Sequence, residues 1–370
     1  MAPPTYAALS VGHLAPFPSP HALQWSTEGQ LLVLTRSAIY ILTPNLGLPF
    51  DEEATMGSRP PGSVGKSTEP VVKWFKTAVE LENSMGHYWW DESSRSLSLC
   101  WQEVAWSPSN LSGNGGCLLV AMNSNHEVSL WAPDKNHLKG EWVKTQDVTS
   151  LIREVALVEI PDGNKGSSAG VHRVLYSQAN CIAWSRQMDV GPPGRMMDTS
   201  LLAIGNRAGS VIFLRSNGTG DLEHVKTVGV SDHWVTQLAW SEWIEDGNGR
   251  CIGTLAFASA DGGFSVISIS SALEQDSDTG DFSPTFDFEH NGLLDVKDLG
   301  RRGITSMQWI FPSDGSQVLV YNKPGTVHLW WYTDSENEPR NTALRLKSPP
   351  LSSSASSLAP ACAIIRTKMS

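Results

Sequence analysis

The stretch HALQWSTEGQLLVLTRSAIYIL (residues 21–42) decides the fold, because its pattern returns four more times along the chain. The pattern is an apolar residue near a tryptophan, a turn, an apolar run, a polar turn and a second apolar run. The runs are short, are rich in β-branched and aromatic residues, and are bounded by Gly, Asn, Asp and Ser, which is typical of strands and turns. We therefore interpret each copy as three antiparallel strands.

Each copy carries one tryptophan in its first run. A looser fourth run, such as GEWVKTQ (140–146) or LEHVKTV (222–228), extends the unit to four strands. We expect the tryptophans to be structural anchors that pack in the core between neighbouring units. They are Trp25, Trp106, Trp184, Trp240 and Trp309, which stand 56 to 81 residues apart.

A four-stranded sheet that is apolar on both faces cannot bury both of them alone, whereas sheets stacked around an axis can. The repeat therefore predicts an all-β fold, a degenerate β-propeller of the WD40 type with at least five recognisable blades. Closed propellers lead us to expect about seven blades. The pattern is degenerate because the usual Gly-His and Trp-Asp dipeptides are missing.

The anchors are further apart than the roughly 40 to 45 residues of a WD40 repeat, so we expect long loop insertions. Segment 71–82 fits a short helix or a strand about equally well, and we interpret REVALVEI (153–160) and HRVLYSQ (172–178) as strands. The predicted organisation is a propeller over 1–334 with inserted loops at 46–70, 162–171, 187–199 and 270–300, a polar Ser-rich linker or loop at 335–357, and the possible start of a further blade at 358–370.

Composition narrows the function. The net charge is −11, and no basic patch offsets it, so we expect contact with DNA only indirectly. The acidic segment 270–300 is either solvated surface or a docking segment for a basic partner. No signal peptide and no membrane span are recognised, and the five widely spaced cysteines fit free thiols in a reducing compartment.

The motifs of enzyme chemistry are missing. The sequence has no G-x-x-x-x-G-K-[ST] phosphate loop and no G-x-S-x-G elbow. The ten histidines lack the spacing of metal ligands. We therefore predict no catalytic, cofactor-binding or metal site, no cofactor and no small-molecule substrate. The aromatic cluster from His87 to Asp91 has two interpretations: a cage for a methylated lysine, or the packing of an inserted loop.

One resemblance is more specific than a general propeller pattern. The stretches WSTEGQLLVLT (25–35), IYILTP (39–44), VAWSP (104–108) and GCLLVAMNSNHEVSL (116–130) resemble the N-terminal propeller region of the transcription factor IIIC delta-type subunit. The resemblance is clear over residues 20–155 and looser to about residue 334. It rests on core residues, so it points to a family without marking a site.

The resemblance implies a non-catalytic scaffold in the nucleus. Its expected partners are the other subunits of transcription factor IIIC and the RNA polymerase III initiation machinery, in the transcription of tRNA-type genes. Two alternatives remain at this point. One is an unrelated WD40 adaptor or chromatin-reader propeller. The other is a subunit associated with histone acetyltransferase activity, which has been linked with the family but has no supporting motif here.

Overall fold

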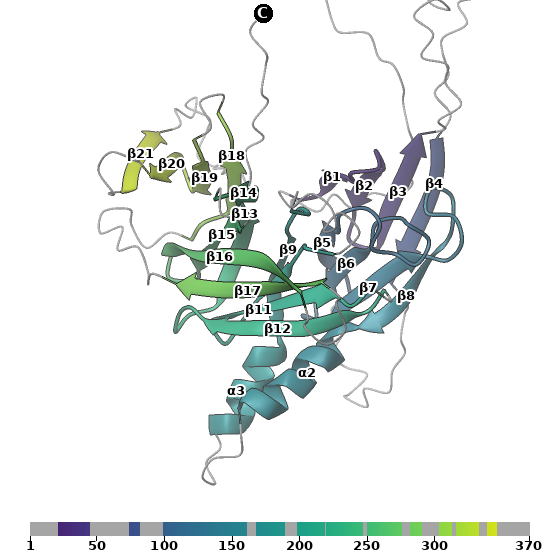
Figure 1. The fold of residues 1–370 in the computed structure, drawn as a ribbon, viewed down its shortest axis with the longest axis horizontal. Coiled ribbons are helices and arrows are strands. Elements are labelled where there is room, and N and C mark those ends of the chain that lie inside the picture. Colours follow the sequence, from purple (N-terminus) through teal and green to yellow (C-terminus); the bar gives the residue numbers. More distant parts are fainter. Residues whose placement is uncertain are drawn as a thin grey trace, which may run out of the picture.

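The computed structural model describes residues 21–44, 74–81, 99–160, 168–188, 198–218, 220–246, 250–275, 282–290, 303–312, 316–332 and 339–345. In this part of the chain, five separate antiparallel sheets follow one another in sequence order. Figure 1 shows them side by side in an arc that runs from the purple N-terminal sheet to the yellow C-terminal one. The all-β propeller prediction is confirmed, with five described blades where about seven were expected.

Each sheet is one blade, and its strands pair in chain order with one exception in blade 4. The blades are blade 1 with β1 (Leu23–Trp25), β2 (Leu31–Leu34), β3 (Ala38–Pro44) and β4 (Trp74–Glu80); blade 2 with β5 (Trp101–Trp106), β6 (Leu119–Asn123), β7 (Val128–Pro133) and β8 (Trp142–Asp147); blade 3 with β9 (Ala179–Trp184), β10 (Leu202–Asn206), β11 (Ser210–Ser216) and β12 (Leu222–Gly229); blade 4 with β13 (Val235–Trp240), β14 (Ile244–Glu245), β15 (Cys251–Ser259), β16 (Phe264–Gln275) and β17 (Phe282–His290); and blade 5 with β18 (Ser306–Ile310), β19 (Val318–Lys323), β20 (Thr326–Tyr332) and β21 (Pro339–Arg345). In blade 4, the short β14 lies beside β15 while β13 pairs directly with β15.

The polar turns predicted between the second and third runs are the β-hairpin turns of the blades. In blade 1, the Thr35 hydroxyl donates a hydrogen bond to the Ala38 carbonyl at 2.7 Å, which closes the turn between β2 and β3. In blade 3, Gly209 has a φ of 80°, and a Cβ at this position would overlap the Ser231 carbonyl oxygen. Only glycine fits this turn without strain.

Some of the fourth strands were predicted from the sequence and others were not. GEWVKTQ and LEHVKTV correspond to β8 and β12, and segment 71–82 contains the strand β4, not a helix. Two predicted loops also contain strands. β16 and β17 occupy much of 270–300, and β21 lies in 335–357, where it pairs with β20 from Thr326 to Tyr332. Ordered sheet therefore continues beyond residue 334.

The segments around 162–171 correct a second prediction. REVALVEI and HRVLYSQ were interpreted as strands, but they lie in the helices α2 (Val148–Glu159) and α3 (Ser168–Ser177). These two helices connect β8 to β9 and lie beside β12 in Figure 1. The predicted segments 46–70 and 358–370, and most of 187–199, lie outside the described residues.

Candidate interaction surfaces between and beyond the blades

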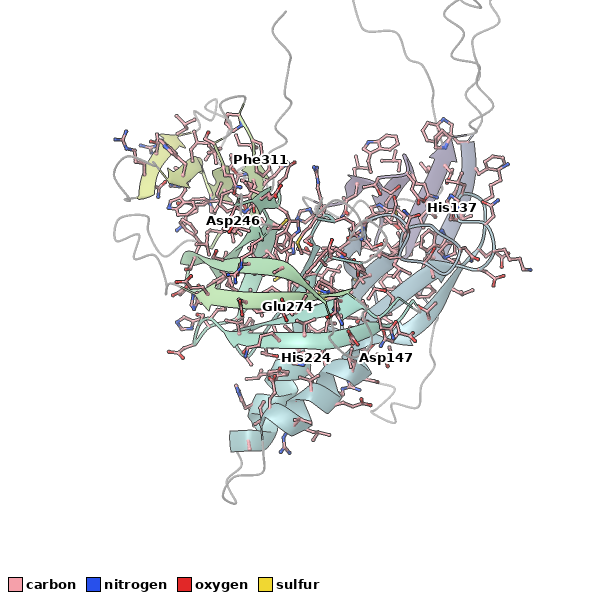
Figure 2. All side chains as sticks on the ribbon, in the orientation of Figure 1. His137, Asp147, His224, Asp246, Glu274 and Phe311 are labelled. Atoms are coloured by element: carbon pink, nitrogen blue, oxygen red, sulfur yellow. The ribbon has the colours of Figure 1, made fainter. Side chains whose placement is uncertain are left out.

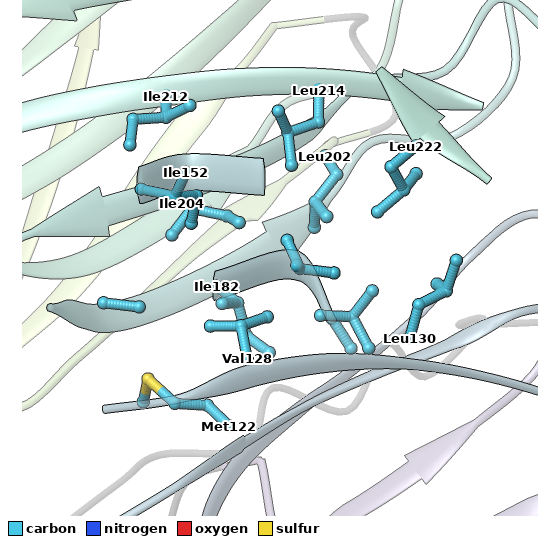
Figure 3. Packing of buried hydrophobic residues seen from close by; sticks show 14 of the residues in the cluster. Met122, Val128, Leu130, Ile152, Ile182, Leu202, Ile204, Ile212, Leu214 and Leu222 are labelled. Atoms are coloured by element: carbon cyan, nitrogen blue, oxygen red, sulfur yellow. The ribbon is translucent and has the colours of Figure 1, made fainter. Parts of the chain in front are cut away.

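Four buried apolar clusters fill the spaces between consecutive blades. Figure 3 shows the cluster between blades 2 and 3, where Val128 and Leu130 of β7 face Ile182, Leu202 and Leu214. Equivalent clusters lie between blades 1 and 2, blades 3 and 4, and blades 4 and 5. Each interior blade therefore buries both faces, one against each neighbour.

Four of the five anchor tryptophans belong to these clusters, and each lies on the side of the preceding blade. Trp106 packs into the cluster between blades 1 and 2, Trp184 between blades 2 and 3, Trp240 between blades 3 and 4, and Trp309 between blades 4 and 5. The first strand of every blade after the first thus presents its tryptophan to the sheet before it.

Two of these tryptophans also bond to the preceding blade. The indole nitrogen of Trp240 donates to the Ala183 carbonyl at 3.1 Å, and that of Trp309 donates to the Ala239 carbonyl at 3.0 Å. Both acceptors lie in the first strand of the neighbouring blade. The contact therefore combines apolar burial with a directional hydrogen bond to a backbone carbonyl.

Trp25 does not follow the expectation of core packing. Its side chain is 60% exposed, whereas Trp309 is 7% exposed. The reason is positional: Trp25 lies in blade 1, which has no preceding blade among the described residues. Its nearest aromatic contact is Trp74 of the same blade, with ring centroids 6.4 Å apart.

A buried carboxyl lies where the first strands of blades 2 and 3 meet. Glu103 of β5 accepts a hydrogen bond from the Ile182 backbone nitrogen at 3.1 Å. Burial raises the pKa of Glu103 from its ordinary value of 4.5 to about 8, and this hydrogen bond only partly opposes the shift. The adjacent Cys181 thiol is buried, and its pKa is raised by that burial and by the neighbouring Glu103. We assign this pair a packing role.

The helical hairpin, formed by α2 and α3, is fixed firmly to blades 2 and 3. Asp147 caps α2 by accepting a hydrogen bond from the Ser150 nitrogen at 3.3 Å. Thr149 accepts from the Val128 nitrogen of β7 at 2.7 Å. Figure 2 shows Asp147 and His224 where the helices meet the sheet. These contacts give the hairpin a defined position.

The second helix is held as well. The Tyr176 hydroxyl lies 2.6 Å from a Glu159 carboxylate oxygen and 2.7 Å from the Thr227 hydroxyl of β12. Burial, followed by the hydrogen bond to Glu159, raises the pKa of Tyr176 well above its ordinary value, so the hydroxyl stays protonated as a donor. Arg173 donates two hydrogen bonds to the Ile160 carbonyl, at 2.9 and 2.6 Å.

Exposed aliphatic side chains lie on both helices of this fixed hairpin, among exposed charged residues such as Arg153 and Glu154. Four aliphatic side chains, Leu157 and Val158 of α2 and Val171 and Val174 of α3, are between 55% and 81% exposed. Single exposed aliphatic side chains are ordinary, but four within one short hairpin favour a protein-binding surface. We call these four residues the hairpin surface.

The comparisons with known proteins fit this architecture. The sequence model of the β-propeller domain of transcription factor IIIC subunit delta matches residues 25–359. The chain belongs to this family. The alternative of a propeller unrelated to transcription factor IIIC is therefore removed, while the family resemblance of the sequence is confirmed over nearly the whole chain.

Other comparisons add less. No match was found among the curated protein sequences. Among solved structures, the chain is similar to one in the crystal structure of the mitotic checkpoint complex, with a TM-score of 0.36, 14% identity, and coverage of 90% of this chain and 74% of that one. It is also similar to one in the structure of BBS1N in complex with ARL6DN, soaked with lead (TM-score 0.34, 11% identity, 87% of this chain and 81% of that one). Both likenesses are weak, and the fold assignment rests on the sheets and the family match.

The structure of this subunit delta family member describes only some of the features that the sequence analysis singled out. The aromatic cluster at residues 87–91 lies outside the described residues. Within the described ranges, no three His, Cys, Asp or Glu side chains converge as metal ligands, and neither helix has the length and apolar character to cross a bilayer. The thiols of Cys100, Cys117 and Cys181 are free.

The helical hairpin is the feature that the sequence interpretation missed. Its signal was present, because Val148, Ile152 and Ala156 recur every four residues behind Asp147, which is a common N-cap residue. The abundance of Val and Ile outweighed that spacing and favoured a strand.

The exposure contrast between anchors predicts unequal stability effects. Trp309→Ala should lower the free energy of unfolding by about 3–5 kcal/mol, because it removes a buried aromatic side chain. Trp25→Ala should lower it by less than about 1 kcal/mol, because its side chain is largely in water. Urea denaturation of both variants measures the difference, and similar losses for the two would contradict the assigned packing.

The raised pKa of Glu103 predicts a pH effect. Between its ordinary value of 4.5 and about 8, the folded carboxyl holds a proton that the unfolded chain has released, so the free energy of unfolding falls as pH rises. Glu103→Gln should remove this loss and stabilise the variant relative to the wild type by on the order of 2 kcal/mol more at pH 8 than at pH 5. Urea denaturation at the two pH values tests this, and a constant difference between the proteins would show that Glu103 is not responsible.

Proposed function

We propose that this chain is a non-catalytic scaffold subunit of transcription factor IIIC that supports RNA polymerase III transcription of tRNA-type genes through protein–protein contacts. Its working place would be the nucleus, and its partners would be the other subunits of the complex and the polymerase III initiation machinery. The observation that carries the proposal is the family match over residues 25–359.

The rigid blades and the helical hairpin that projects from them support a scaffold role. The blades supply rigid, separately packed sheets. The connection from β8 to β9 supplies a helical hairpin that is anchored on one side and carries four exposed aliphatic side chains. A surface held in a defined position costs little conformational entropy when a partner binds. We assign the hairpin surface as one contact site of this subunit within the complex.

The charge supports an indirect relation to DNA. With a net charge of −11, the chain gains little from the release of counterions on a duplex. We propose that promoter recognition is supplied by other subunits. We also propose that the propeller occupies residues 1–345. The acidic segment 270–300, which includes β17, retains the role proposed from sequence, a solvated surface or a contact for a basic partner.

Affinity purification of the tagged full chain from nuclear extract tests the function. We expect the other subunits of transcription factor IIIC among the co-purified proteins by mass spectrometry. If none of them is enriched over a tag-only control, the proposed function is wrong.

The hairpin surface gives a sharper form of that test. The double variant Val158→Ser, Val174→Ser should reduce recovery of the complex by about tenfold, since two exposed aliphatic contacts are removed without disturbing the buried side of the hairpin. Val143→Ser is the matched control, because Val143 is an exposed valine on β8 of blade 2. Equal recovery of the double variant and the wild type would exclude the hairpin surface as a contact.

The charge argument predicts weak DNA binding. The purified chain should bind duplex DNA only non-specifically at physiological salt, with a Kd of about 100 μM or weaker. Fluorescence anisotropy with labelled duplexes, one carrying a tRNA-gene promoter and one scrambled, measures this. Tight binding that distinguishes the two duplexes would overturn the indirect role.

A further inference from the structure

An arginine lies over an exposed tryptophan where blade 3 meets blade 4. The guanidinium carbon of Arg207 is 3.8 Å from the centre of the Trp234 ring, which is the geometry of a cation–π contact. Arg207 belongs to the turn between β10 and β11, and Trp234 belongs to the connection from β12 to β13. The Trp234 side chain is 42% exposed, so the pair lies at the surface of the protein.

Both residues of the pair are held in place by hydrogen bonds. The Arg207 side chain donates through Nη1 to the Gln178 amide oxygen at 3.1 Å, and the Arg207 backbone nitrogen donates to the Gln178 carbonyl at 3.1 Å. The Trp234 carbonyl accepts from the Ala260 nitrogen of blade 4 at 2.9 Å. A partner that binds this pair therefore orders little that is not already ordered.

The positive charge of Arg207 is not neutralised within the described part of the chain, where the ion pairs join other side chains. Arg186, for example, pairs with Glu242 at 2.7 Å. The Arg207 side chain instead bonds to a neutral amide, and its Nε atom is buried with no hydrogen-bond acceptor. An arginine fork pairs best with a carboxylate or a phosphate. The site therefore offers a fixed guanidinium to an anionic group from outside.

The pair continues the hairpin surface. Val171, Val174 and Gln178 follow one another at spacings of three and four residues, so they lie on one side of α3 and its C-terminal end. Val171 and Val174 are 56% and 55% exposed. Because Gln178 is also the residue that holds Arg207, the aliphatic side of α3 leads directly to the Arg207–Trp234 pair.

We propose that the partner that contacts the hairpin surface also places a carboxylate on Arg207, so that the Arg207–Trp234 pair is the charged end of one continuous interface. This inference deepens the proposed function and rests on it, because the partner is drawn from the other subunits of transcription factor IIIC. The partner segment carries aliphatic side chains over Val171 and Val174 and an aspartate or glutamate that reaches Arg207. Tryptophan and arginine are the residue types that most often dominate the binding energy of an interface.

A phosphate group fits this site less well than a carboxylate. Two exposed acidic residues lie close to Trp234: Asp232 precedes it by two positions, and Asp261 follows the residue that bonds to the Trp234 carbonyl. Like charges repel, and a phosphorylated segment or a DNA backbone brings more negative charge than one carboxylate does. The surroundings of Arg207 therefore favour an acidic side chain of a protein.

The test uses the full chain co-expressed with the other subunits of the complex and purified through a tag on this chain. Arg207→Glu should lower the recovered subunits by at least about tenfold, because it sets two negative charges against each other. Trp234→Ala should lower them by about fivefold, because it removes the ring that supports the guanidinium. Arg250→Glu, at an exposed arginine between β14 and β15, and Trp25→Ala, at an exposed tryptophan of blade 1, are the matched controls and should equal the wild type.

A cross-link identifies the group that Arg207 meets. Arg207→Lys keeps the positive charge and supplies an amine, which a carbodiimide joins to a contacting carboxylate as an amide, the carbodiimide taking up the water that is lost. Mass spectrometry of the assembled variant should find an aspartate or glutamate of another subunit attached at position 207. Arg250→Lys, treated in the same way, should give no such product. Melting temperatures of the free variants equal to that of the wild type establish that lost assembly is not lost folding.

The outcomes separate this inference from the proposed function. If the wild type assembles and Arg207→Glu and Trp234→Ala assemble equally well, the inference is wrong and the proposed function stands. If the wild type assembles with no subunit, both fall. If phosphatase or nuclease releases the partner from the wild type, the group on Arg207 is a phosphate and the inference is overturned. If a variant melts lower than the wild type, the cross-link decides, and its absence from every other subunit overturns the inference.

Discussion

The structure depends on one packing constraint: a blade that is apolar on both faces needs another sheet on each side. The arrangement of the blades follows from it. The anchor tryptophans lie toward the preceding blade, the bonds from Trp240 and Trp309 cross between first strands, and the buried clusters alternate with the sheets along the arc. The same constraint makes the two ends of the arc different from its interior, although their sequences follow the same repeat.

The fold could be predicted from the sequence because the repeat is local. A tryptophan, a turn and two apolar runs specify a hairpin wherever they occur, and five copies specify a row of sheets. β21 was missed because its residues PRNTALR are mostly polar, so it is recognised only through its pairing with β20. An edge strand takes its hydrogen bonds from a neighbour and needs little hydrophobicity of its own.

The candidate surfaces were harder to predict for a physical reason. Trp25 and Trp309 occupy equivalent places in the repeat, yet their exposure differs because exposure is set by the neighbouring blade and not by the residue. The helical hairpin was misread because β-branched residues such as Val155 and Val158 are common in strands, and the N-cap at Asp147 was given too little weight. The first error concerns what lies next to a segment, which one repeat cannot report, whereas the second concerns the weight given to a local signal.

Membership of the transcription factor IIIC subunit delta family gives these surfaces their context. The family pattern consists of core residues, so it preserves the row of sheets and says little about the connections between them. The hairpin between β8 and β9 is such a connection, and it is held to both flanking blades by Thr149 and Tyr176. A partner bound there would contact a position defined by two blades at once.

The row of described blades also implies a gradient of local stability. Each interior blade is stabilised by two interfaces, whereas blades 1 and 5 each have one among the described residues. In a linear array of units coupled only to their neighbours, the end units open most easily, and opening proceeds inward. Blade 3 lies between the two largest buried clusters. It would therefore be the last blade to unfold when unfolding proceeds inward from either end.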